Sequence, residues 1–499
     1  MVAQIAYSIV ESRPSREPPR VLTPEEWAAQ QWAQTDFGDQ RVTARAVAIG
    51  TKMVVHPDQS LPAQMQDPAM LRAAYRFLDN YYVTMEKLLM PHRQQTLAAA
   101  GRVPVVLMVE DTTELDYTQH RSTKDLGPIG NGRGQGLLLH STLGIVPDTR
   151  EVLGVAHAQA VLRVPNPEPR SRRVRSAESQ VWVASARSVG APPEGCLWVH
   201  VSDQASDGFE YFATCIDLGK HFLARVYHNR VLDWEQGRPE PENETASHLL
   251  DYARSLPPCP ESDYTVQVRA TDKHPKRDAR VVLQWATVRL PVPARVADDF
   301  RGHAAIAAWV LRAWEPEPPA GVEPVEWVLL TSLPIDNLQD AMRLIDWYTC
   351  RWFCEDYHQC LKTGCQVERT QLDSGMDIRR LLGFAIPIAV RLLAMREQVR
   401  QAPDLPAVAV VEPLMVEVLS RRQHLEAASM TISEFWRRVA RLGGHQGRRG
   451  DGEPGWKTLW KGWRYLSDLT DGARLFTDQQ VPPPAANQVS QTIIWRESG

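Results

Sequence analysis

Two aspartates follow apolar runs that are typical of buried strands. Residues 103–109 form one such run and lead to Asp111, and residues 196–201 form another and lead to Asp203. A short continuous apolar run indicates a strand covered on both faces, so we expect each carboxylate where a central strand stops. Carboxylates that bridge two Mg²⁺ ions about 3.5–4 Å apart can activate an attacking oxygen and stabilise a leaving oxygen in phosphoryl transfer. Mg²⁺ suits such a site because it prefers oxygen ligands and retains several waters.

A third carboxylate has independent support in a segment with helical spacing. Tyr348, Arg351, Glu355 and Lys362 stand at offsets of 0, 3, 7 and 14, which fall within about 60° of arc on an ideal helix. A carboxylate flanked by Arg, Lys and a tyrosine hydroxyl combines a metal ligand with phosphate-binding groups, as phosphoryl transfer on a nucleic acid requires. The alternative is an ordinary amphipathic helix with a solvated charged face. Thr349 could also kink this helix, and the shared face would then begin only at Arg351.

The elements that must position these residues predict an α/β chain. From residue 103 onward the pattern indicates three strands, a helix, a strand, a helix and a strand, which is the order of a ribonuclease-H-like core. A capping Thr23 and a first-position Pro24 predict where a helical region begins. We expect, in order, a flexible leader at 1–22, a helical domain at 23–99, the first part of the core at 100–233, a β-rich insertion at 234–325, the second part of the core at 326–400, and a helical domain at 401–499.

Composition excludes several classes of protein. Hydrophobic residues make up 43% and charged residues 23% of the 499 residues, which argues against wholesale disorder. No apolar stretch approaches the ~18 residues that cross a bilayer, and residues 1–20 lack the apolar core of a signal peptide, so we expect a cytoplasmic protein without a membrane partner. The formal net charge of -4 does not exclude a nucleic-acid partner, because local groups of Lys and Arg bind phosphates. Arg41 with Arg45 and Arg72 with Arg76 are four residues apart on helix faces, and composition alone favours solvated surface for them.

Taken together, these motifs resemble those of cut-and-paste DDE transposases of the insertion-sequence-four group, most closely those of the transposon-five type. The resemblance extends from about residue 27 to about residue 475. Residues 38–45 and 74–77 resemble the N-terminal DNA-binding region of that family, and residues 110–113 resemble its first catalytic motif. Tyr348, Arg351, Glu355 and Lys362 reproduce the family signature Y-x2-R-x3-E-x6-K, and residues 440–444 followed by 456–463 resemble its C-terminal region.

The resemblance implies a role for each matching residue. Asp111, Asp203 and Glu355 would be the catalytic triad that binds two Mg²⁺ ions, with Mn²⁺ able to substitute. Trp327 would stack on a base in a hairpin intermediate, and such stacking is worth ~1–3 kcal/mol; without the resemblance, a buried strand residue is the better reading. The other implied DNA contacts are Tyr348, Arg351 and Lys362 on the phosphates, and Arg225, His228, Arg230, Arg41, Arg45 and Arg76 elsewhere.

The resemblance also implies a reaction and its partners. Water nicks one strand at the transposon end, the freed 3′-hydroxyl attacks the opposite strand to form a hairpin, a second water opens the hairpin, and the 3′-ends join target DNA. The implied partners are double-stranded DNA, both inverted repeats and target, and a second copy of the chain in a synaptic complex, with no small-molecule substrate. Residues 23–99 would bind DNA, residues 401–499 would dimerise, and the bacterial protein would associate with the nucleoid when bound to DNA.

One departure and three alternatives remain open on the sequence. The family usually has Arg-Glu-Ala-Asp after the second aspartate, whereas this chain has Gln204, Ala205, Ser206 and Asp207, so a basic and an acidic residue are missing. A relic that binds DNA without cutting it, or a metal-dependent nuclease that does not join DNA, would share most of the motifs. A zinc site is the third alternative, but its spacing lacks paired C-x2-C units and buried thiols are favoured. Its candidate ligands are Cys350, Cys354, His358, Cys360 and Cys365.

Overall fold

The computed structural model describes residues 22–163, 177–234, 247–259, 264–268, 276–296, 298–448 and 454–477. Leu22–Ala402 form one compact unit, and the chain from Pro403 onward belongs to a second. Nearly all of the predicted leader lies outside the described residues. Within the described residues no helix is both long and apolar enough to span a membrane.

The first unit begins with helices whose ends are capped by side chains. Thr23 forms a capping box with Glu26, and Pro24 occupies the first turn of the first helix, as the sequence predicts. Asp39, Asp67 and Thr84 each accept a backbone N–H at the start of a later helix. The helices are α1 Pro24–Trp32, α2 Gln40–Val55, α3 Leu61–Met65, α4 Pro68–Leu78 and α5 Met85–Ala100.

A mixed sheet forms the centre of the first unit and confirms the predicted α/β class. In the described residues its strands follow the order β2-β3-β1-β5-β6-β10-β9-β8-β7, with β4 paired to β3. β1 is antiparallel to β3 and parallel to β5, and β5 is parallel to β6. The strands are β1 Val105–Asp116, β2 Gly127–Ile129, β3 Gly134–Val146, β4 Glu151–Val161, β5 Leu197–Ser202, β6 His221–Arg225, β7 Tyr264–Val268, β8 Arg277–Leu290, β9 Ile306–Trp314 and β10 Glu326–Thr331.

The segment predicted to be a β-rich insertion adds its strands to the central sheet. β9 pairs with β10 and β8 pairs with β9, both in antiparallel register, so the ladder continues from the core strand β6 through β10 into this segment. The helix α8 Leu249–Ser255 packs against β8 and β9. Its Leu249 and Ala253 join an apolar cluster that also contains side chains of β6, β9 and β10.

β1 is longer than the apolar run predicts. The expectation that this strand stops before Asp111 is wrong, because β1 continues to Asp116 in antiparallel register with β3. The parallel pairing with β5 does end early, at Val109 opposite Val201. Asp111 therefore lies inside a strand but beyond the last pair that joins β1 to β5.

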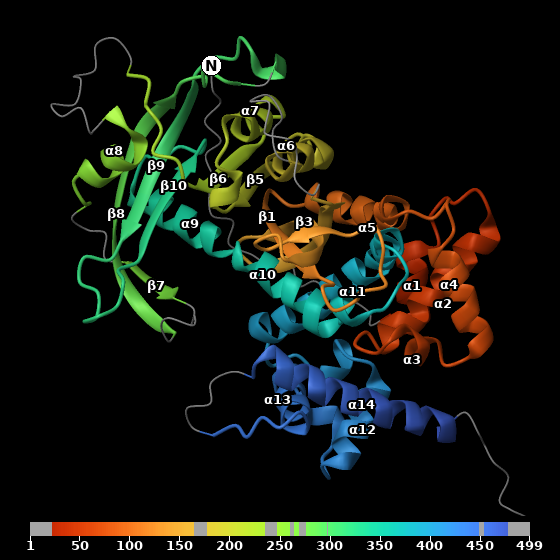
Figure 1. The fold of residues 1–499 in the computed structure, drawn as a ribbon. Helices are drawn as coiled ribbons and strands as arrows, with labels where there is room; N and C mark the ends of the chain where they lie inside the picture. The colour runs from red at the N-terminus through yellow and green to blue at the C-terminus, as the bar shows by residue number, and fades with distance from the viewer. Residues whose placement is uncertain are drawn as a thin grey trace, which may run out of the picture. The chain divides into compact units, whose positions relative to one another are not determined.

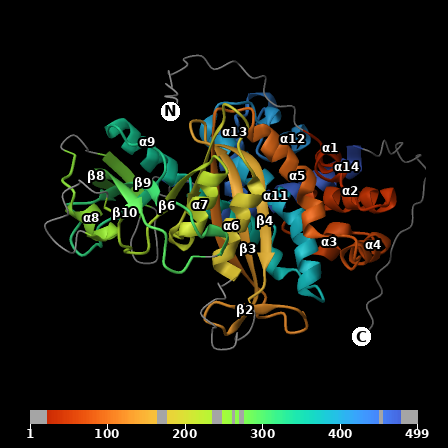
Figure 2. The same ribbon diagram turned by 90° about the horizontal axis from the view of Figure 1, so that it is seen from above.

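Helices cover the sheet (Figures 1 and 2), and two of them carry Tyr348 and Glu355. α6 Ala177–Val189 and α7 Phe209–Asp217 pack against each other, and α5 packs against β4 and α11. α10 lies beside β1 and β3 (Figure 1). In the described part of the first unit, the α-helices after β10 are α9 Leu338–Thr349, α10 Trp352–Gln359 and α11 Gly375–Gln401, with a π-helical turn, η4, at Cys360–Gly364.

The second unit is helical in its described residues, as the sequence predicts for this part of the chain. Its helices are α12 Pro413–Arg422, α13 Ile432–Leu442 and α14 Trp456–Thr477. Trp436 of α13 and Trp463 of α14 stack with ring centroids 5.2 Å apart. α13 and α14 approach so closely that a Cβ atom at Gly443 or Gly462 would collide with the backbone of the facing helix.

Candidate active site

Asp111 lies on β1 among charged neighbours from other elements. Its side chain is 17% exposed, and Arg351 Nη1 lies 3.7 Å from its Oδ2. Burial raises the pKa of Asp111 to about 7, and the negative charges of Asp203 and Glu355 add to the rise, whereas Arg351 lowers it. The three predicted carboxylates are thus close enough to influence one another.

Asp203 follows β5 directly, as predicted. β5 ends at Ser202, and Asp203 caps the short 3₁₀ turn Gln204–Ser206 by accepting the N–H of Ala205 at 2.9 Å. Gln204 Nε2 donates to the carbonyl of Val226 at 3.2 Å. Gln204 therefore braces the loop after β6.

Arg351 lies between two of the carboxylates. Its Nη2 donates to Glu355 Oε1 at 2.7 Å, one turn along the chain, and its other terminal nitrogen faces Asp111. Burial lowers the pKa of Arg351, but the neighbouring Tyr348 hydroxyl and the carboxylates of Glu355 and Asp111 more than offset this and raise it above its ordinary value. Arg351 is therefore a permanent cation at the junction of β1 and α10.

Tyr348 joins this group from the end of α9. Burial raises its pKa, the positive charges of Arg351 and Arg225 oppose the rise, and Asp203 adds to it. The ring of Trp327, on β10, lies edge-on to Tyr348 with centroids 5.6 Å apart, and Trp327 is only half-buried. The structure thus brings Tyr348, Trp327 and Arg225 to the same region as the carboxylates.

The single helix predicted from Tyr348 to Lys362 is interrupted twice. α9 ends at Thr349, whose hydroxyl donates to the carbonyl of Asp346 at 2.6 Å, and α10 begins only at Trp352. The π-helical turn η4 then shifts the phase around Lys362. The common helix face is therefore wrong for the full span, although the kink that Thr349 could cause is present.

Lys362 is directed to β1 further along from Asp111. Its Nζ donates to the carbonyl of Glu114 at 2.5 Å and lies 3.5 Å from Glu368 Oε1. These contacts hold the turn η4 against the end of β1 that projects past β5. Lys362 is about 30% exposed, so its ammonium group also faces solvent.

The basic residues after β6 divide into exposed and structural groups. Arg230 pairs with Asp207, which is 1% exposed, and Asp207 Oδ2 also accepts the N–H groups of Tyr227 at 2.7 Å and His228 at 2.8 Å. The retained acid of the altered motif thus organises the loop that carries His228 and Arg230. Sequence reasoning missed Tyr227, which is 63% exposed and packs edge-on against His228.

The N-terminal arginines lie on exposed positions of two helices. Arg41 and Arg45 project from α2 and Arg76 from α4, and Arg41 forms an ion pair with Asp39 at 2.8 Å. Tyr81 and Tyr82, between α4 and α5, are 84% and 65% exposed. The sequence pattern did not single out these two exposed tyrosines.

The donor set of the three acids fits Mg²⁺ in its chemistry, because carboxylate oxygens are the ligands that this ion prefers. As the side chains lie, no group of three His, Cys, Asp or Glu residues in the described part of the chain is arranged to hold a metal ion. Cys350, Cys354, Cys360 and Cys365 are buried, and the thiol of Cys354 donates to the carbonyl of Val109 at 3.2 Å.

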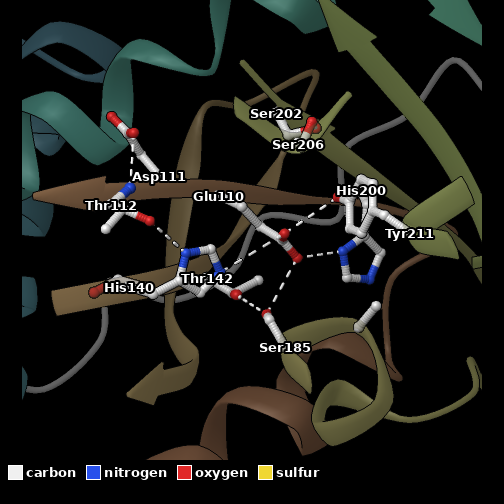
Figure 3. Close-up of polar contacts among 12 residues, drawn as sticks. Glu110, Asp111, Thr112, His140, Thr142, Ser185, His200, Ser202, Ser206 and Tyr211 are labelled. Carbon is white, nitrogen blue, oxygen red and sulfur yellow. Dashed lines mark hydrogen bonds and ion pairs between the residues drawn. The ribbon is translucent and has the colours of Figure 1, made fainter. Parts of the chain in front are cut away.

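Glu110, the neighbour of Asp111, was not predicted to matter. The two side chains project from opposite faces of β1, Asp111 toward α10 and Glu110 into a buried group of polar side chains (Figure 3). This follows from the two-residue period of a strand. An acidic residue directly after an apolar run was the only signal that the sequence offered.

Two family models match separate parts of the chain. Residues 24–83, which include α1 to α4, match the model described as transposase DNA-binding. Residues 387–480, which include α12 to α14, match the model described as the transposase Tn5 dimerisation domain. The N-terminal part of the chain is therefore similar to transposase DNA-binding domains, the C-terminal part is similar to the Tn5 transposase dimerisation domain, and the two matches point to a transposase.

Proposed function

We propose that this protein is a DDE transposase of the insertion-sequence-four group, with Asp111, Asp203 and Glu355 as its metal-binding triad. The observation that carries the proposal is the mutual influence of the three carboxylates around Arg351, in a chain whose two ends match transposase domains. A ribonuclease-H-like core is supported by the strand order β4-β3-β1-β5-β6, in which β3 is antiparallel to β1.

The DNA backbone would be held by the basic and aromatic groups beside the acids. Arg351 and Arg225 supply positive charge near Tyr348, and the half-buried ring of Trp327 offers a face on which an unpaired base can stack. Arg41, Arg45 and Arg76 lie on exposed helix positions within the part that matches the DNA-binding model. Residues 23–99 would thus bind the inverted repeat, and residues 401–499 would hold two subunits together in a synaptic complex in the bacterial cytoplasm.

Chemistry at the site would consist of successive phosphoryl transfers on DNA. Bound Mg²⁺ would supply charge stabilisation for the attacking and leaving oxygens. The protein's own side chains would position the phosphate and hold the carboxylates in place. The order of steps would be nicking by water, hairpin formation by the 3′-hydroxyl, hairpin opening, and joining of the 3′-ends to target DNA.

The proposal is tested with purified full-length protein, Mg²⁺ and a labelled duplex that carries the inverted repeat beside its own gene. We expect nicked and hairpin products from the wild type. The cleavage rate of Glu355→Gln should fall by more than about a hundredfold, because removing a metal ligand should reduce activity more than removing a residue that only hydrogen-bonds to a ligand. Glu434→Gln is the matched control, since Glu434 also accepts a hydrogen bond from an arginine four residues away at 2.7 Å.

Each of the other possible outcomes would indicate a different function or a different active site. Specific binding without cleavage would indicate a DNA-binding relic. Cleavage without strand-transfer products on a target plasmid would indicate a nuclease. Cleavage that survives Glu355→Gln would refute the assigned triad.

A further inference from the structure

A buried polar network lies behind β1, on the face opposite to Asp111 (Figure 3). Its centre is Glu110, which is fully buried and forms a short contact with His200 Nδ1. The Glu110 carboxylate also accepts hydrogen bonds from the hydroxyls of Tyr211 at 3.1 Å and Ser185 at 3.3 Å. Removing one partner of a carboxylate buried in this way leaves a buried charge incompletely compensated, which is costly.

The network contacts both strands that carry the aspartates. Glu110 immediately precedes Asp111 on β1, and His200 lies on β5 three residues before Asp203. Thr112, on the other side of Asp111, pairs through its hydroxyl with His140 Nδ1 at 2.8 Å. Both chain neighbours of Asp111 are therefore fixed by buried side chains.

The turn at Asp203 is fixed in a similar way. Ser202 and Ser206 hydroxyls lie 2.6 Å apart, and the Ser206 hydroxyl donates to the carbonyl of Asp203 at 2.8 Å. Ser202 and Ser206 are buried at the same end of β5 (Figure 3). The hydroxyls of Ser202 and Ser206 thus hold the backbone around Asp203 in place.

Side-chain contacts matter here because the backbone ladder has already ended. The last pair between β1 and β5 joins Val109 to Val201, so no backbone pair joins the two strands at Asp111 and Asp203. The contact between Glu110 and His200 links the two strands at the end of that ladder. It is well placed to set the spacing of the two carboxylates.

We propose that Glu110 and His200 are positioning residues that fix Asp111 relative to Asp203 and thereby set the affinity of the site for a divalent cation. The inference rests on the proposed function. Partners that orient metal ligands from behind are known to change metal affinity by about ten- to a hundredfold when replaced. A network that serves only folding would change stability and leave metal affinity unaltered.

The test measures Mn²⁺ binding to the full-length protein by the loss of the free Mn²⁺ signal in electron paramagnetic resonance. We expect Glu110→Gln and His200→Gln each to weaken Mn²⁺ binding by about ten- to a hundredfold. The double variant should be little weaker than either single variant, because both remove the same contact. Glu397→Gln is the control, since Glu397 is also a buried carboxylate and accepts from Arg400 at 2.9 Å, on α11.

A second variant covers the case in which Glu110→Gln does not fold. Thr112→Val keeps the shape of the side chain, removes the hydroxyl that pairs with His140, and should weaken Mn²⁺ binding in the same direction by a smaller factor. Unchanged Mn²⁺ affinity in the folded variants, with only a lower melting temperature, would overturn the inference. If the wild type binds no Mn²⁺, or if Asp111→Asn does not reduce Mn²⁺ binding, both the proposed function and this inference are refuted.

Discussion

The buried side chain of His92, on α5, connects α1 to the central sheet. Its Nε2 accepts the N–H of Val155 on β4 at 3.1 Å, and its Nδ1 lies 2.8 Å from Gln31 Oε1 on α1. This pattern requires a neutral ring with the proton on Nδ1. Burial lowers the pKa of His92 to about 4.

Protonation of His92 should therefore weaken the fold in mild acid. An unfolded histidine titrates near 6.5, so the unfolded chain takes up the proton first as the pH falls. The stabilisation is complete above about pH 6.5, declines as the pH falls toward about 4, and amounts to about 3 kcal/mol. Urea unfolding of the wild type and of His92→Gln at pH 7.5 and pH 5 measures this.

The variant should lose less stability than the wild type between these two pH values. It should not become fully insensitive, because burial also lowers the pKa values of His140 and His157 to about 4. His445→Gln, at a partly buried histidine of the second unit, serves as the control and should keep the wild-type dependence. An unchanged slope in His92→Gln would contradict the assignment.

Among the elements, the break between α9 and α10 determines where Arg351 and Glu355 lie. Arg150, in the turn between β3 and β4, donates to Asp346 Oδ1 at 2.5 Å and to the Thr349 hydroxyl at 3.3 Å. Its φ of 57° lies in the left-handed region that a non-glycine residue rarely adopts. The turn therefore retains a strained residue whose side chain clamps the end of α9.

Comparing Arg150→Ala with Arg150→Gly separates the strain from the clamp. Both variants lose the side chain, so both should cut DNA about tenfold more slowly while binding it normally. Glycine adopts the left-handed backbone freely, so Arg150→Gly should be about 1 kcal/mol more stable than Arg150→Ala. Melting temperatures and single-turnover cleavage rates measure the two effects.

A control at another left-handed residue completes this comparison. His424 has a φ of 55° and lies in the second unit, so His424→Gly should gain stability without a change in cleavage rate. Wild-type cleavage rates in both Arg150 variants would show that the clamp has no part in catalysis.

The same elements show what the sequence could predict. Apolar runs located β1 and β5, because strands buried on both faces need continuous apolar residues, and the expected order of strands and helices also included β3, β4 and β6. The length of β1 was missed, since Asp111 to Glu114 are polar residues that pair with β3 rather than a strand end. The helical wheel failed because the periodicity assumes an unbroken helix, and a clamp from Arg150, distant in sequence, cannot be seen in local spacing.

The site was predictable in part for a similar reason. Spacing and resemblance identified Asp111, Asp203, Glu355 and Arg351, and the structure brings their charges to one place. The network around Glu110 was not predictable, because His140, Ser185, His200 and Tyr211 come from four separate elements. Only the fold makes these side chains neighbours.

At the scale of the whole molecule, the proposed function requires the second unit as well as the carboxylates. Residues 387–480 match a dimerisation model, and within them α13 and α14 meet at two glycines. A Cβ atom at Gly462 would collide with the Val439 carbonyl, whereas one at Gly472, on the same helix, meets nothing within 4 Å. These two positions form a matched pair for testing whether the packing of α13 on α14 supports dimerisation.

Gly462→Ala should therefore separate α13 from α14 and reduce the dimer, whereas Gly472→Ala should preserve it. Overpacking of this kind costs about 1–3 kcal/mol, and the alanine at position 472 should gain about 1 kcal/mol in helix stability. Light scattering coupled to size-exclusion chromatography measures the mass of each protein bound to its inverted-repeat duplex. A two-protein complex that forms equally well with both variants would show that the α13–α14 contact is not needed for pairing. A one-protein complex in Gly462→Ala alone, with DNA affinity retained, would assign subunit pairing to this helical hairpin.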